Sequence, residues 1–307
     1  MPKQDEPRPF IRCNSWKDSP HVKDAGWPVA HTQSTTIVKS GTVSGGMRRI
    51  QSIMMAAIRW PKWYEFIRPR DDDPNWNKVV GQNDGVVTHL LGEAVMPAMA
   101  RQIMLCAATA AVGPITKLVD LYCCGGGFSL GAAEAVPGLE HVDGVDLDIM
   151  VLRNYRHNIA KALPTAKVTG HEKRAPTSLA ELRKLLGRKL GQGTHIHASP
   201  PCQAFVNGNR KEKVNLAPSF ALMVAACKAG CTASFEEHRD AAKMALEWLE
   251  IQSQDDQALL YVYSVTARDY GSPTARDRCI VTTFPLVGEK RERVNEQGEW
   301  VVDPPHV

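Results

Sequence analysis

The segment Ser-Pro-Pro-Cys-Gln at 199–203 holds the side chain best suited to covalent chemistry in this sequence. It follows a short run of alternating character at 194–198, which predicts a strand. Two prolines fix φ and remove backbone donors, so the loop that presents Cys202 should be stiff. A cysteine thiolate on such a loop can attack an electron-poor carbon. A lone cysteine in an intracellular chain is more often buried and inert, so the surrounding motifs must decide.

A glycine-rich loop is the second candidate for chemistry. The apolar run 117–121 predicts a buried strand, the loop 122–129 follows it, and 130–135 predicts a helix. Strand, glycine loop and helix form the first unit of a doubly wound nucleotide-binding sheet, where glycines let the backbone approach a ligand closely. The next predicted strand, 141–148, has an acidic end where Asp146 can accept hydrogen bonds from ribose hydroxyls.

The remaining elements must bring these two sites together. Helices are predicted at 98–111, 152–162, 181–189, 216–227 and 241–251, and strands at 167–169, 232–235, 259–265 and 279–283. This alternation indicates an α/β fold with a doubly wound, mostly parallel sheet, which the last of these strands should close. Ligands in such sheets lie at the carboxyl ends of the strands. The glycine loop, Asp146, Cys202, Glu236 and the pair Arg276 and Arg278 can therefore share one cleft.

Composition narrows the class of protein. The chain has 307 residues, is 43% hydrophobic and carries a net charge of +4, which permits nucleic-acid binding without requiring it. It contains no apolar run long enough to span a membrane, and its first residues do not resemble a signal peptide. Eight scattered cysteines favour a reducing compartment. We therefore expect a protein of the cytoplasm, or of the nucleus in a eukaryote, that is not secreted, and no metal site is predicted.

Several motifs together resemble those of the DNA (cytosine-5)-methyltransferases. Pro-Cys-Gln at 201–203 resembles their nucleophile motif, and 120–129 resembles their S-adenosylmethionine loop. Residues 146–158 resemble the second motif, and 271–278 resemble the Gly-x-Pro-Gln-x-Arg-x-Arg motif. The resemblance covers roughly residues 28–284. It implies a Rossmann-like S-adenosylmethionine-dependent methyltransferase fold, S-adenosyl-L-methionine as cofactor, and double-stranded DNA as partner.

The order of these motifs is unusual. Residues 92–97 resemble a Gly-Asn-Ala-Val-x-Pro element that normally ends these enzymes, and 48–64 resemble the Arg-rich helix that precedes it. Both come before the cofactor loop here, which indicates a circular permutation. The catalytic domain would be 47–284, with 47–112 as the permuted elements and 113–284 as the core. The target-recognition region would be divided between 1–46 and a charged, poorly packed tail at 285–307, so a partner chain or a homodimer is also expected.

The resemblance implies a covalent mechanism. Cys202 would attack carbon 6 of a cytosine flipped out of the duplex, so that carbon 5 can accept a methyl group. A carboxylic acid must protonate ring nitrogen 3, and the family uses the Glu of a Glu-Asn-Val motif. This chain lacks that tripeptide, and Glu236 is preferred over Glu237 as its substitute. Arg276 and Arg278 would hold the base carbonyl or a phosphate, or else pair with Asp269 or Asp277.

The resemblance implies three sets of residues. The catalytic set is Cys202, Glu236, Arg276 and Arg278. The cofactor set is Glu93, Ala94, Val95, Asp120, Tyr122, Cys123, Gly125, Gly126, Gly127, Phe128, Ser129, Asp146, Leu147 and Pro201. The substrate set is Pro200, Gln203, Asn207 and Arg210.

The chain also departs from the family pattern. Cys124 stands at a usual Gly, Thr274 at a usual Gln and Glu93 at a usual Asn, and only the polar pair at 171–172 stands near the third motif. Two alternatives therefore stay open within the fold: a degenerate or partner-dependent DNA-binding subunit, and methylation of cytosine in RNA. A thiol enzyme on a nucleotide fold is a third alternative, although no histidine stands out as the base for Cys202.

Overall fold

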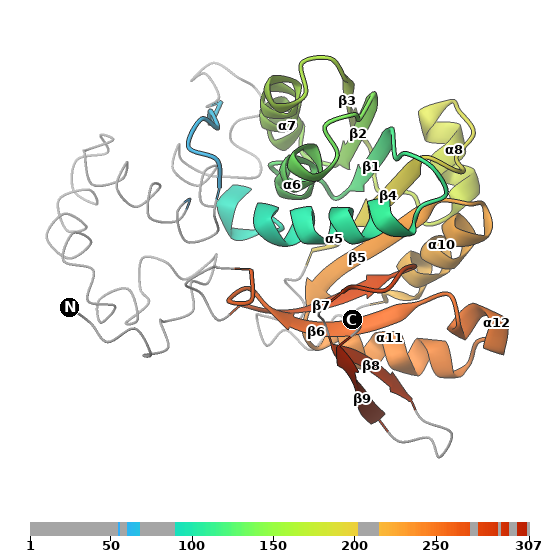
Figure 1. The fold of residues 1–307 in the computed structure, drawn as a ribbon. Helices are drawn as coiled ribbons and strands as arrows, with labels where there is room; N and C mark the ends of the chain where they lie inside the picture. The colour runs from blue at the N-terminus through green and yellow to red at the C-terminus, as the bar shows by residue number, and fades with distance from the viewer. Residues whose placement is uncertain are drawn as a thin grey trace, which may run out of the picture.

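The computed structural model describes residues 55, 60–67, 90–201, 215–270, 276–287, 290–294 and 300–305. Among these residues, nine strands form one sheet in the order β3-β2-β1-β4-β5-β7-β6-β8-β9, with helices on both faces (Figure 1). The strands are β1 (Lys117–Leu121), β2 (His141–Asp146), β3 (Lys167–Glu172), β4 (Thr194–Ala198), β5 (Thr232–His238), β6 (Tyr261–Thr266), β7 (Asp277–Thr282), β8 (Lys290–Val294) and β9 (Trp300–Pro305). The helices are α5 (Pro97–Ala110), α6 (Gly127–Ala135), α7 (Ile149–Ala162), α8 (Leu179–Leu186), α10 (Ala217–Lys228), α11 (Ala241–Glu250) and α12 (Gln254–Gln257).

The expected α/β fold class with a doubly wound, mostly parallel sheet is confirmed. Strands β1 to β5 are parallel, and β7 lies antiparallel between β5 and β6. The chain builds outward from β1 through β2 to β3, then crosses back to place β4 on the other side of β1. The strand order therefore reverses between β1 and β4, where ligands bind in open sheets of this kind.

Two expectations about the last part of the chain were wrong. The strand predicted at 279–283 does not close the sheet, because β7 lies inside it. The tail from 285 is not poorly packed throughout, since β8 pairs with β6 and β9 pairs with β8. An edge strand needs only backbone hydrogen bonds from one neighbour and tolerates charged residues. The charged composition therefore suggested a poorly packed tail, although the backbone of this segment continues the sheet.

Each face of the sheet is covered by its own set of helices. On β1, Leu118 packs with the helices α5, α6 and α7, while the next residue, Val119, packs with α8, α10 and α11. This alternation is the period of two that a strand requires. Burying each large apolar side chain contributes about 1.5–3 kcal/mol. Both faces of the sheet are thus covered by helices, as is usual for parallel strands.

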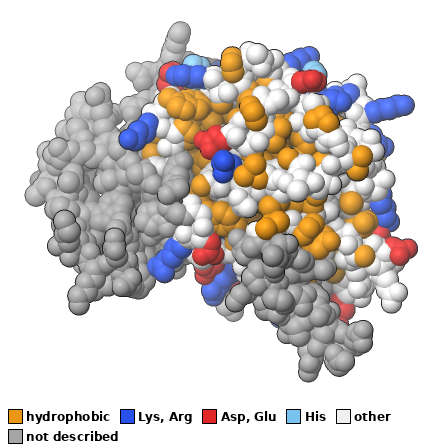
Figure 2. Space-filling view, viewed as in Figure 1, with side chains coloured by type: hydrophobic (Ala, Val, Ile, Leu, Met, Phe, Trp, Pro, Cys, Tyr) orange, Lys and Arg blue, Asp and Glu red, His pale blue; other side chains and the backbone are white. Residues whose placement is uncertain are grey.

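Helix α5 packs closely on α6. A Cβ atom on Gly131 of α6 would lie 2.2 Å from the Pro97 carbonyl oxygen and 2.7 Å from the Ala100 Cβ. On the face of the molecule seen in Figure 1 and Figure 2, apolar side chains occupy the middle, and most Lys and Arg side chains lie around the margin. None of the helices that the structure describes is long and apolar enough to cross a membrane.

Candidate functional site

The loop between β1 and α6 has an unusual backbone. Tyr122, Cys124 and Gly126 all have positive φ, at 60°, 45° and 85°. This region favours glycine, so the two side-chain-bearing residues hold strain of the order of 1 kcal/mol or more each. Cys124 stands where a glycine was expected from the resemblance. The backbone nevertheless adopts the turn that the glycine pattern predicted.

Protein atoms fill the space beside the three glycines of this loop. A Cβ on Gly125 would lie 3.2 Å from the Tyr64 hydroxyl, and one on Gly126 would lie 2.9 Å from a methyl group of Ile159. A Cβ on Gly127 would lie only 2.1 Å from the Val95 carbonyl oxygen. Close approach to a ligand remains a prediction for these glycines. The structure adds a second reason for them, which is close packing against other segments of the chain.

Asp146 joins the end of β2 to the glycine loop. Its Oδ2 accepts a hydrogen bond from the Cys124 N–H (3.1 Å), and its Oδ1 accepts one from the Asp148 N–H (3.0 Å). Burial raises the pKa of Asp146. A carboxylate has about four lone-pair positions, so it can accept further donors such as ribose hydroxyls. The next residue, Leu147, is 70% exposed and offers an apolar surface beside this carboxylate.

Four residues of the predicted cofactor set have side chains that face the protein interior. Asp120 and Ser129 are buried and bonded to each other at 2.6 Å, and burial raises the pKa of Asp120 to about 7. Phe128 stacks on His197, and the Cys123 thiol is buried with a pKa well above its usual range. These side chains support the loop from below. Only their backbone groups are placed to reach a ligand on it.

Glu93, Ala94 and Val95 lie beside the first turn of α6, because the Val95 carbonyl is packed against Gly127. Ala94 and Val95 are buried, and Glu93 is partly exposed. No side chain caps this first turn at Gly126, and the backbone N–H of Ser129 is bonded to the Asp120 carboxylate. The structure thus brings the 93–95 segment to the glycine loop, as the resemblance implied.

A second polar cluster lies at the ends of β4, β5 and β7. Ser199 donates its hydroxyl to Glu236 Oε2 at 2.8 Å, and Arg278 Nε lies 2.6 Å from Glu236 Oε1. Glu236 and Arg278 are only 3% and 6% exposed. The alternative pairing of Arg278 with an aspartate carboxylate is wrong, because Glu236 is its partner. Ser199 directly precedes the two prolines, so the cluster lies at the start of the candidate nucleophile loop.

The structure separates the two candidate acids. The strand predicted at 232–235 continues to His238, so successive side chains point to opposite faces. Glu236 faces Ser199, whereas Glu237 faces the other side and accepts a hydrogen bond from the backbone N–H of His238 at 2.7 Å. Burial raises the pKa of Glu237 to about 8. In the described part of the chain, Glu236 is therefore the one of the two that contacts Ser199, at the start of the nucleophile loop.

Other predicted residues lie elsewhere. Arg276 is described and lies near Glu237, whose pKa its charge lowers slightly against the effect of burial. His171 of the polar pair at 171–172 contacts Asp143 at 2.9 Å, away from the glycine loop. The residues Cys202, Gln203, Asn207 and Arg210 and the segment 1–46 lie outside the described residues. In the described ranges, no group of three or more His, Cys, Asp or Glu side chains is arranged to hold a metal ion.

Sequence reasoning missed one contact of the glycine loop. The hydroxyl of Tyr64, which is 5% exposed, donates to the Gly125 carbonyl at 2.9 Å. The sequence of 60–66 contains four aromatic residues. Their close spacing indicated burial, but no local pattern indicates which loop a buried tyrosine will reach.

No protein-family model and no curated protein sequence matches this chain. Solved structures with a similar fold include a candidate rRNA methylase from Clostridium thermocellum (11% identity, TM-score 0.40, covering 60% of this chain and 94% of that one). TrmN from Thermus thermophilus (20% identity, TM-score 0.38) covers 61% of this chain, which spans 48% of that protein. A SAM-dependent methyltransferase from Agrobacterium tumefaciens (18% identity, TM-score 0.40) covers 62% of each chain. Likeness of this extent concerns the fold alone.

Proposed function

We propose that this protein is an S-adenosylmethionine-dependent methyltransferase that methylates carbon 5 of cytosine in DNA. The observation that carries the proposal is the contact between Ser199 and Glu236, which sets a buried carboxyl group at the start of the Pro-Pro-Cys segment. The glycine loop and Asp146 lie at the ends of the adjoining strands β1 and β2. One edge of the sheet therefore offers both a nucleotide-type site and an acid beside a candidate nucleophile.

The residues of the glycine-loop edge fit the proposed cofactor. Asp146 would accept hydrogen bonds from the ribose hydroxyls, and the exposed Leu147 would pack against the adenine ring. The first turn of α6, which no side chain caps at Gly126, would bind the methionine carboxylate through the N–H groups that precede Ser129. When bound, S-adenosylmethionine supplies an electrophilic methyl group on a positively charged sulfur.

The second cluster would act on the base. The Cys202 thiolate would form a bond to carbon 6 while Glu236 gives a proton to nitrogen 3, which makes carbon 5 nucleophilic. After carbon 5 has gained the methyl group, a base removes the carbon 5 proton. The Cys202–carbon 6 bond then breaks and restores the thiolate, and nitrogen 3 returns its proton to Glu236. The role of Cys202 in this mechanism is inferred from the sequence motif at 201–203.

Glu236 must change partner to take this part. Its two carboxyl oxygens already contact Ser199 and Arg278, so neither faces a base. A cytosine carbonyl would draw the Arg278 guanidinium toward itself. Glu236 could then form a hydrogen bond to nitrogen 3 and give it a proton. The ion pair would thus hold the acid in place before the base arrives.

The chemistry is tested by transfer of labelled methyl from S-adenosylmethionine to duplex DNA and to RNA of the same sequence. We expect label on carbon 5 of cytosine in DNA, loss of label in Cys202→Ala, and a rate at least 100-fold lower in Glu236→Gln. Glu237→Gln is the matched control and should stay within about threefold of wild type. Label in RNA alone would replace DNA as the substrate, and equal transfer by Cys202→Ala would overturn the covalent mechanism.

A duplex with 5-fluorocytosine gives an independent test. Fluorine at carbon 5 cannot leave as a proton does, so the thiol adduct should persist and shift the protein on a denaturing gel. Wild type should form the adduct only with S-adenosylmethionine present, and Cys202→Ala should form none. Cofactor binding without transfer or adduct would support a partner-dependent or degenerate subunit instead.

The arrangement of the chain is also proposed to be a circular permutation. Residues 60–67 and 93–97, which precede the cofactor loop in sequence, contact that loop and α6 in the structure. The segments 1–46 and 285–307 would then contribute to target recognition. Removal of 1–46 should weaken duplex binding at least tenfold and leave S-adenosylmethionine affinity unchanged. Equal loss of both would show that 1–46 is part of the catalytic fold.

A further inference from the structure

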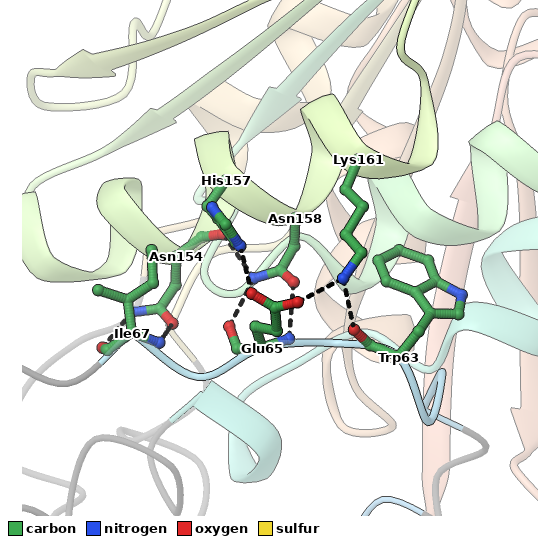
Figure 3. A network of polar contacts seen from close by, with 7 residues as sticks. All are labelled: Trp63, Glu65, Ile67, Asn154, His157, Asn158 and Lys161. Carbon is green, nitrogen blue, oxygen red and sulfur yellow. Dashed lines mark hydrogen bonds and ion pairs between the residues drawn. The ribbon is translucent and has the colours of Figure 1, made fainter.

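Residues 60–67 include a turn at 62–63, and the residues after this turn lie along α7 (Figure 3). The same segment contacts the glycine loop through Tyr64. We call this segment the strap. It belongs to no strand of the sheet, and the contacts described below fix its position on both sides. Its distance in sequence from the loop, 61 residues between Tyr64 and Gly125, makes the contact a product of the tertiary fold.

Two asparagines of α7 hold the strap backbone. Asn154 accepts from the Ile67 N–H at 2.7 Å and donates to the Ile67 carbonyl at 3.1 Å. Asn158 accepts from the Glu65 N–H at 2.8 Å and donates to the Glu65 carbonyl at 2.8 Å. Four helical residues rise about 6 Å and two extended residues span about 6.6 Å, so the two spacings match. Both asparagines are fully buried, which makes these bonds costly to lose.

The outer side of the strap carries an exposed charge cluster. Glu65 contacts His157 at 2.8 Å and pairs with Lys161, and all three side chains are more than 40% exposed. Exposed ion pairs contribute about 0–1 kcal/mol. Glu65 therefore offers a substitution on the strap itself that should leave the buried contacts intact.

The inner side of the strap contacts the glycine loop. Tyr64 is buried whereas the neighbouring Glu65 is exposed, and Tyr64 donates its hydroxyl to the Gly125 carbonyl. Burial raises the pKa of Tyr64, so the phenol stays protonated and can act as the donor. Trp60 packs edge-to-face on Tyr64 with ring centroids 5.1 Å apart, and its ring lies 3.0 Å from the position of a Cβ on Gly127.

The geometry points to Tyr64 as a positioning residue for the cofactor: its hydrogen bond fixes the Gly125 peptide, and the strap holds Tyr64 in place. The inference rests on the proposed function for its consequence, S-adenosylmethionine binding. The loop is strained at Tyr122 and Cys124, so it needs outside contacts to keep this conformation. Asp146 fixes the loop at the Cys124 N–H, and Tyr64 fixes it at the Gly125 carbonyl.

Hydrogen exchange tests the positioning without any cofactor. Tyr64→Phe removes only the hydroxyl, and we expect amide exchange in residues 122–128 to become at least fivefold faster, with β4 and β5 unchanged. Glu65→Gln alters the same strap on its exposed side and should leave exchange in 122–128 within twofold of wild type. Unchanged exchange in the loop of Tyr64→Phe would overturn the inference, whatever the protein binds.

Cofactor titration tests the consequence. Loss of one neutral hydrogen bond that holds the site corresponds to about a fivefold higher Kd. We expect Tyr64→Phe to raise the Kd and the KM for S-adenosylmethionine about fivefold, with kcat and the KM for DNA within twofold of wild type. An equal effect on both substrates would indicate general loosening and contradict a positioning role.

The two readouts separate the two proposals. Faster loop exchange in Tyr64→Phe together with wild-type protein that binds no S-adenosylmethionine would overturn the proposed function and retain the positioning of the loop. Wild-type binding with identical exchange and Kd in Tyr64→Phe would retain the function and overturn the positioning role.

Discussion

Asp146 and Glu236 are two carboxylates at the same edge of one sheet, and the structure satisfies them in different ways. Asp146 accepts hydrogen bonds from backbone N–H groups, those of Cys124 and Asp148 among them. Glu236 accepts from a hydroxyl and pairs with the buried Arg278. Neutral hydroxyls can add to Asp146 without disturbing a charge pair. Glu236 must exchange a charged partner before it can act, which suits a reactive group more than a binding one.

The largest effect should come from the charged side of this comparison. Arg278→Met would leave the buried Glu236 carboxylate without its cation, and we expect unfolding free energy to fall by about 3–5 kcal/mol at pH 7. Urea denaturation measures this change. Adding Glu236→Gln to that variant should recover most of the loss, because the uncompensated charge is then gone. A double variant as unstable as Arg278→Met would show that the guanidinium acts through packing.

At the glycine-loop end of the comparison, we expect steric crowding to affect stability more than the loss of a charge. Gly127→Ala would place a methyl group 2.1 Å from the Val95 carbonyl oxygen, and we expect a loss of about 3 kcal/mol in urea denaturation. Gly138→Ala is the control, since nothing lies within 4 Å of its Cβ position. Asp146→Asn should cost less than about 1 kcal/mol of stability but weaken S-adenosylmethionine binding at least tenfold. A large stability loss in Asp146→Asn would remove the contrast with Glu236.

The slope of the unfolding free energy against pH should differ in sign between buried carboxyl groups and buried histidines. Burial raises the pKa of Asp120 from 3.8 to about 7, so between these values the folded protein binds a proton that the unfolded chain does not. This group therefore lowers stability as pH rises from about 4 to 7, by up to about 1.4 kcal/mol per pH unit. Asp120→Asn should remove that fall, seen as a difference between variant and wild-type unfolding curves. A constant difference across this range would contradict the raised pKa.

Two buried histidines should give the opposite slope. Burial lowers the pKa of His195 from 6.5 to about 3 and that of His197 well below 6.5. Below pH 6.5 the unfolded chain binds protons that the folded protein excludes, so stability falls as pH falls toward 3. His197→Gln should make the wild-type fall between pH 6.5 and 4 less steep by up to about 1.4 kcal/mol per pH unit. An unchanged slope would mean that His197 is protonated in the folded state.

The smallest effect should come from the strained loop itself. Cys124→Gly would relieve the φ of 45° but add conformational freedom to the unfolded chain, so we expect a gain of no more than about 1 kcal/mol. Thermal unfolding measures it. A clear loss of stability would show that the Cys124 side chain contributes more than its backbone strain costs.

The local sequence pattern determined several strands and turns of this protein. The strands β1 and β4 have the predicted bounds, β1 from its short apolar run and β4 from its alternating residues. The turn of the glycine loop and the acidic end of β2 were also predictable, since both depend on residues close in sequence. These features require no knowledge of distant contacts.

The tertiary structure decided what depends on distant residues. It gave Arg278 to Glu236 in place of an aspartate, turned Glu237 to the other face, and inserted β7 between β5 and β6. It also placed Tyr64 on Gly125. The sequence by itself determined which residues are buried, extended or turning, because those preferences act over a few residues. Only folding selects which buried polar groups become partners, because each needs a donor or acceptor that a different segment supplies.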